Sequence, residues 1–145
     1  MTDTKDKILV EIQKAITHIL GNSSAALMRK AGTSASCEIW PELPSGKTIK
    51  EAGEIMKHGI DSLGDFGEFS IIAENEGVVS IEFKNCYFAR FTEKSGKPCG
   101  QQPICFFGFG LVEETFKRLT GIQTKVELMN REDGTEVCFE TATPR

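Results

Sequence analysis

Several features are missing from this sequence, and each absence excludes a class of protein. No uninterrupted apolar run reaches about 18 residues, so no segment is predicted to span a membrane. The first residues, Met1 to Lys7, are charged and lack the apolar core of a signal peptide, so we expect a cytoplasmic protein. Positive charge is scarce and scattered, because 17 Lys and Arg stand against 21 Asp and Glu, for a net charge of −4. Phosphate contacts need clustered Lys and Arg, so we predict no nucleic-acid partner.

Catalytic motifs are missing as well. The chain has no glycine-rich phosphate loop, no G-x-S-x-G motif and no histidine close to a candidate nucleophile. Glu113 and Glu114 are adjacent, but they are typical of the solvated face of a helix rather than of an acid/base pair. His18 has no partner at metal-ligand spacing. The sequence therefore predicts a protein that is not an enzyme.

The length and composition indicate one globular domain over residues 1–145, with 39% apolar and 26% charged residues. Its first part is predicted to be helical. Apolar residues at helical spacing predict an amphipathic helix over residues 4–20. A second, short helix is predicted from Ser24 to Ala31, with Gly32 as its stop. Prolines and a glycine then predict a loop over Thr33–Lys47.

The rest of the chain is predicted to combine two helices with four strands. Thr48 and Glu51 form the pattern of a capping box, which predicts a third helix running to about Leu63. The remaining predicted elements are strands at 68–74 and 79–84, a helix at 104–120, and strands at 122–128 and 137–141, where Val137, Phe139 and Thr141 alternate. We therefore predict an α+β fold, with N-terminal helices packed on a four-stranded antiparallel sheet and a long helix between two hairpins.

The stretch from Asn85 to Gly121 holds the residues that most favour a binding site. Three of the five cysteines lie in it, and a fourth follows near the C-terminus. We expect these four cysteines, Cys86, Cys99, Cys105 and Cys138, to meet beside an apolar pocket. The aromatic residues predicted to line that pocket are Trp40, Phe88, Phe106, Phe107 and Phe109.

Two glycines inside the long predicted helix lower its stability, and their presence needs an explanation. Gly108 and Gly110 each cost about 1 kcal/mol of helix stability relative to alanine. Such a cost indicates that a backbone or a ligand packs close to the helix at these positions. Close packing of the helix against the sheet is the explanation that we favour from the sequence.

Three passages of the chain carry a resemblance to a known family. The first is G-N-S-S-A-A-L-M-R-K-A-G, Gly21 to Gly32, in which a small-residue helix ends in a basic residue, alanine and glycine. The second is I-C-F-F-G-F-G-L-V-E-E-T-F-K-R-L-T-G, Ile104 to Gly121, and the third is the hairpin V-E-L-M-N-R-E-D-G-T-E-V-C-F-E, Val126 to Glu140. Together they resemble the 4-vinyl-reductase-like domain, also called a hydrocarbon-binding domain, which shares its fold with TRAPP vesicle-tethering subunits.

The resemblance implies a small-molecule-binding module that forms a homodimer and holds zinc through cysteines near its pocket. Cys105 and Cys138 match two cysteine positions of the family, whereas its other hairpin cysteine is Asn130 here. Cys86 and Cys99 are the candidates to replace it. The predicted zinc ligands are therefore these four cysteines, although the chain has no C-x-x-C pair.

Three functions from different classes follow from these observations. The first is a sensor that binds a small hydrophobic molecule, has zinc at the edge of its pocket and signals through a separate partner. The second is a thiol-based redox or metal sensor, because a thiolate is favoured at Cys105 near a helix N-terminus. The third is a non-catalytic protein-interaction module like the TRAPP subunits, in which the apolar pocket is only structural.

Overall fold

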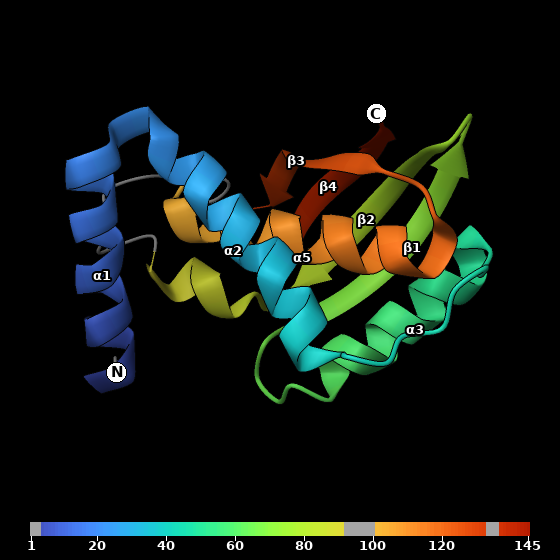
Figure 1. The fold of residues 1–145 in the computed structure, drawn as a ribbon, viewed down its shortest axis with the longest axis horizontal. Helices are drawn as coiled ribbons and strands as arrows, with labels where there is room; N and C mark the ends of the chain where they lie inside the picture. The colour runs from blue at the N-terminus through green and yellow to red at the C-terminus, as the bar shows by residue number, and fades with distance from the viewer. Residues whose placement is uncertain (1–3, 92–100, 133–136) are drawn as a thin grey trace.

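The computed structural model describes residues 4–91, 101–132 and 137–145, and it confirms the predicted α+β class and order of elements (Figure 1). Four helices pack with a four-stranded antiparallel sheet. The helices are α1 (Thr4–Leu20), α2 (Ser24–Ile39), α3 (Ile49–Asp61) and α5 (Pro103–Thr120), with short 3₁₀ helices η1 (Gly21–Ser23) and η2 (Tyr87–Phe91). The strands are β1 (Glu68–Asn75), β2 (Val78–Lys84), β3 (Thr124–Glu132) and β4 (Val137–Pro144). None of the helices in these ranges is long and apolar enough to cross a membrane.

The two predicted hairpins join into one sheet in the order β1-β2-β4-β3. β4 therefore lies in the interior beside β2, while β1 and β3 form the edges. Ile81 of β2 and Leu128 of β3 lie opposite Glu140 of β4 from either side. This register places Glu140 in the middle of the sheet.

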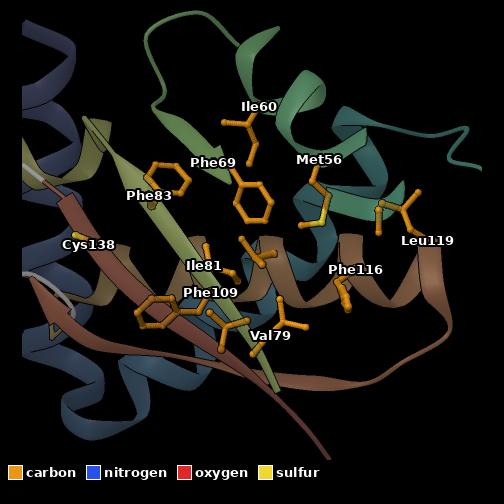
Figure 2. Packing of buried hydrophobic residues seen from close by; sticks show 14 of the residues in the cluster. Met56, Ile60, Phe69, Val79, Ile81, Phe83, Phe109, Phe116, Leu119 and Cys138 are labelled. Atoms are coloured by element: carbon orange, nitrogen blue, oxygen red, sulfur yellow. The ribbon is translucent and has the colours of Figure 1, made fainter. Parts of the chain in front are cut away.

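The core lies between one face of the sheet and the helices α3 and α5 (Figure 2). Val79, Ile81 and Phe83 of β2 alternate with less buried residues, as the period-two pattern predicts, whereas burial along β1 does not alternate. The most deeply buried apolar side chains are Ala52, Met56, Ile60, Phe69, Val79, Ile81, Leu111, Phe116, Leu119, Val126 and Ala142.

The prediction that α2 stops at Gly32 is wrong, because the helix continues to Ile39 and takes up nearly half of the predicted loop. Gly32 lies inside the helix, where a Cβ atom would come within 2.0 Å of the Phe107 carbonyl oxygen on α5. Arg118 of α5 then supports the C-terminal end of α2 by donating to the carbonyl oxygens of Ser36 at 2.9 Å and Trp40 at 2.7 Å. These contacts with α5, which lies far along the chain, stabilise the extra turns.

The glycines of α5 show a different partner from the one predicted. A Cβ atom on Gly110 would lie 2.0 Å from the carbonyl oxygen of Arg29, so the close neighbour is the backbone of α2 rather than the sheet. Gly108 is different, since its nearest neighbour is the ring of Phe88 at 3.8 Å. Gly32 and Gly110 thus allow two helix backbones to touch.

The third helix begins as predicted and ends slightly earlier. Thr48 Oγ1 accepts a hydrogen bond from the Glu51 N–H at 3.1 Å, and the Glu51 carboxylate accepts one from the Thr48 N–H at 3.0 Å. This is the reciprocal capping box. The same hydrogen bonds lower the pKa of Glu51, because they stabilise its charged form.

Helix α1 lies at one end of the molecule and buries an unexpected face (Figure 1). Its buried residues are Asp6, Val10 and Gln13. Tyr87 Oη donates to the Asp6 carboxylate, and Gln13 Oε1 accepts from the Ile104 N–H at 2.9 Å. Polar contacts with η2 and the start of α5 therefore hold α1 in place.

Candidate functional site

An apolar pocket lies between α5, the start of η2 and the core-facing side of the sheet. Its free volume is about 40 Å³, which is enough for the end of a slender molecule but far below the volume of a drug-sized site. The residues that line it are Phe66, Phe83, Cys86, Phe88, Cys105, Gly108, Phe109, Leu111, Val112, Leu128, Cys138 and Glu140.

The structure brings together three of the four cysteines that the sequence singles out. Cys86 follows β2, Cys105 lies in the first turn of α5 and Cys138 lies on β4, and all three line this pocket. Cys99, the fourth, is outside the described residues. Cys37 is exposed on α2 and does not line the pocket.

The predicted aromatic residues divide between the pocket and other contacts. Phe88 and Phe109 line the pocket. Phe106 faces Arg29, whose guanidinium lies 5.5 Å from the ring centroid. Phe107 packs edge-on against Phe88 with centroids 5.9 Å apart. Trp40 lies at the end of α2 and covers Gly59 of α3, where a Cβ atom would be 3.2 Å from the indole ring, so it is placed away from the pocket.

Arg131 of β3 gives the Cys138 thiol a polar neighbour. Its Nη1 donates to Cys138 Sγ at 3.0 Å, because the two residues lie opposite each other on the paired strands β3 and β4. A guanidinium beside sulfur is the kind of neighbour that favours the thiolate form of cysteine. Gln102, fully buried before α5, directs Nε2 toward Cys105 Sγ at 3.9 Å.

Glu140 is the pocket residue that the sequence analysis does not identify. The sequence analysis recognised the strand from the alternation of Val137, Phe139 and Thr141. The residues that face the core are the ones between them, Cys138, Glu140 and Ala142. Burial, and to a lesser extent the charge of nearby Cys138, raise the pKa of Glu140 to about 8. Within the described ranges, the side-chain carboxyl group of Glu140 makes no hydrogen bond or ion pair. The available signal was a glutamate two residues after Cys138, which places both residues on the same face of the predicted strand.

The described residues do not form a zinc cage. In residues 4–91, 101–132 and 137–145, no group of three or more His, Cys, Asp or Glu side chains is arranged to hold a metal ion. Cys86, Cys105 and Cys138 line the same pocket, but they are not arranged as a group that could hold a metal ion. The four-cysteine site therefore stays a prediction that depends on Cys99.

Comparisons with known proteins assign a fold rather than a family. No family model matches the sequence, and no curated protein matches it either. Solved structures do match, and one of them shows that the chain shares its fold with a TRAPP subunit. One of them is trafficking protein particle complex subunit 3 from Naegleria fowleri, covalently bound to palmitic acid. It superposes with a TM-score of 0.59 at 12% sequence identity, over 95% of this chain and 93% of that chain.

Proposed function

We propose that this chain is a non-catalytic protein-interaction module that assembles with a second copy of itself through α1. The observation that carries the proposal is the orientation of this helix. Its most apolar stripe is exposed, with Ile8 at 54%, Ile12 at 50% and Ile19 at 78% of full exposure. Polar Asp6 and Gln13, at 1% and 4%, occupy the buried side.

The physical argument is that a helix in a monomer normally buries its apolar stripe. Ile8, Ile12 and Ile19 are spaced so that they fall on one side of α1, and exposed Leu9 and Leu20 widen that side. A contiguous apolar patch of this kind on a soluble domain marks an interaction surface. Burial against another chain removes the patch from water.

A second copy is the partner that best fits this surface. The stripe lies on one straight helix, and the same helix of another copy provides an equally apolar, self-complementary surface about a two-fold axis. The fold comparison supports assembly, because the solved neighbour is by its title a subunit of a complex. No catalytic constellation is needed for such a role.

The test is the mass of the protein in solution. We expect a dimer for the native chain at micromolar concentration and a monomer for the double variant Ile12→Glu/Ile19→Glu, because charges on the stripe oppose burial. The matched control is Ile72→Glu, which places a charge on an apolar residue of β1 that is 52% exposed and far from α1 in the fold. Light scattering after size exclusion measures the result. A native monomer, or a double variant that stays dimeric, contradicts the proposal.

The apolar pocket between α5 and the sheet favours a second function, which is the binding of a slender apolar molecule. Three thiols and a carboxyl converge on an otherwise apolar cavity, and perturbed polar groups in an apolar pocket are typical of ligand sites. The structural neighbour holds palmitic acid covalently. We propose that Cys138, which Arg131 contacts, accepts an acyl group from an acyl thioester. The Cys138 sulfur forms the new thioester bond as the donor thiol leaves with the proton.

Mass spectrometry of the intact protein tests this second function. After incubation with butyryl-coenzyme A, whose short chain suits a free volume of about 40 Å³, we expect a mass increase of one butyryl group that hydroxylamine removes. Cys138→Ser should lose most of the signal. Cys37→Ser should keep it, because Cys37 is exposed and outside the pocket. Equal labelling of the two variants would show that the reaction is not specific to the pocket.

A further inference from the structure

The carboxyl group of Glu140 is a polar group that the fold leaves unused inside an apolar pocket. Among the described residues that line this pocket, Glu140 is the only acidic or basic side chain apart from the thiols. Its carboxyl group makes no hydrogen bond or ion pair within the described part of the chain. Arg131 contacts the neighbouring Cys138 instead, and donates to its Sγ at 3.0 Å. The hydrogen-bonding capacity of the Glu140 carboxyl group is therefore available to a ligand.

The residues around this carboxyl group are apolar. Ile81 of β2 and Leu128 of β3 lie opposite Glu140 on the two neighbouring strands. Phe109 and Val112 of α5 line the pocket from the helix side. An ionised carboxylate among such neighbours is costly unless a cation or several hydrogen-bond donors compensate for it. The described surroundings of Glu140 supply neither, so a cation that carries N–H donors would be the most favourable occupant.

The size of the pocket limits the rest of the occupant. The free volume is about 40 Å³, which corresponds to roughly three buried water molecules at about 10–15 Å³ each. Such a space admits a short unbranched chain and excludes a bulky head group. Phe66, Phe83 and Phe88 give the pocket an apolar lining that suits an alkyl chain. A molecule that matches both features is short, slender and apolar except for a cationic end.

We propose that this pocket binds a short primary alkylamine in its ammonium form, with the ammonium group paired to the Glu140 carboxylate and the alkyl chain against the phenylalanine rings. An ammonium group has three N–H donors, so it supplies both the charge and the hydrogen bonds that the carboxyl group lacks. Its positive charge also favours the ionised form of Glu140. The inference rests on the pocket of the second proposed function, but it requires no reaction at Cys138.

Other head groups match this pocket less well. A carboxylate would be repelled by the ionised Glu140, because like charges at short distance are unfavourable. A quaternary ammonium group has no N–H donor and is bulky for a free volume of about 40 Å³. A hydroxyl group donates one hydrogen bond and has no charge, and hydrogen bonds between ionised groups are roughly twice as strong as neutral ones. The amine is therefore expected to bind more tightly than the alcohol of the same chain length.

Titration with n-butylamine, followed by the methyl NMR signals of Leu111, Val112 and Leu128, tests this site, because these residues line the pocket. The titration is made at pH 9, where Glu140, with a pKa of about 8, is ionised and a primary amine keeps its proton, as lysine does. We expect n-butylamine to shift these signals and n-butanol to bind at least tenfold more weakly. Glu140→Gln should lower the affinity for n-butylamine at least tenfold and change the affinity for n-butanol less than twofold.

Two control variants complete the test. Glu127→Gln removes an exposed carboxyl group of β3 and should keep the native affinity for n-butylamine. Cys138→Ser should change that affinity less than threefold, which separates amine binding from acylation of the thiol.

Equal affinity for the amine and the alcohol, unchanged amine binding in Glu140→Gln, or methyl shifts only outside the pocket overturns the inference. A loss in Cys138→Ser as large as in Glu140→Gln also overturns it, because the thiol would then hold the ammonium group. If n-butanol binds or Cys138 is butyrylated while n-butylamine does not bind, the inference fails and the second proposed function stands.

Discussion

Gly110→Ala is expected to lower the free energy of unfolding by about 3 kcal/mol or more. The added Cβ atom would lie 2.0 Å from the carbonyl oxygen of Arg29 and 2.8 Å from its carbonyl carbon. Both are backbone atoms, so no side-chain rotation relieves the overlap, and α2 and α5 must separate along the contact that joins them. For a domain of this size we expect the thermal midpoint to fall by roughly 10 °C.

Gly108→Ala is the matched control, because it makes the same chemical change in the same helix two residues away. Its Cβ atom would meet the Phe88 ring at 3.8 Å, an ordinary contact. Helix propensity then dominates, and we expect no loss or a gain of up to about 1 kcal/mol. Chemical unfolding of both variants measures the difference. Similar losses in the two variants would show that the α2–α5 contact is not as close as the structure has it.

Glu140→Gln is expected to remove much of the dependence of stability on pH. The pKa of Glu140 is about 8 in the folded chain against 4.5 for an ordinary carboxyl group. Between these values the folded chain holds a proton that the unfolded chain has released, so folding becomes less favourable as the pH rises. The loss begins above pH 4.5 and ends near pH 8, with a slope of about 1.4 kcal/mol per pH unit at most. Glutamine cannot ionise, so the variant should be the more stable protein at pH 8.

Urea unfolding at pH 5, 6, 7 and 8 measures this effect. We expect the native chain and Glu140→Gln to have similar stability at pH 5 and to differ by about 3 kcal/mol at pH 8. Glu127→Gln serves as the control, because Glu127 is an exposed carboxyl on the adjacent strand β3. It should retain the pH dependence of the native chain. A slope that survives in Glu140→Gln would place the responsible group elsewhere.

These two predictions connect the fold to its candidate functions. The α2–α5 contact holds the helix that forms one wall of the pocket, and Glu140 forms part of the opposite wall. Substitutions at Gly110 therefore report on the scaffold, whereas substitutions at Glu140 and Cys138 report on the pocket itself. The stripe on α1 lies outside both and can be tested independently.

The local patterns of the sequence determined most of the fold. Period-two alternation located the strands, the Thr48–Glu51 capping box located the start of α3, and Gly121 ends α5 in the left-handed conformation with φ of 80°. These features depend on residues a few positions apart, so they can be recognised without the rest of the chain. The sequence also predicted that Cys86, Cys105 and Cys138 lie together, although this grouping depends on the pairing of β2 with β4.

Only the tertiary structure decided the features that depend on distant partners. In the sequence Gly32 resembles a helix stop. In the fold it lies inside α2 because the backbone of α5 passes close to it, and Arg118 stabilises the end of α2. The role of Glu140 depends on which face of β4 meets the helices, and that register is set by pairing with β2 and β3. The apolar stripe of α1 is visible in the sequence, but its exposure follows from the polar contacts of Asp6 and Gln13 with residues far along the chain. Spacing along the chain reports local conformation, whereas burial is a property of the assembled fold.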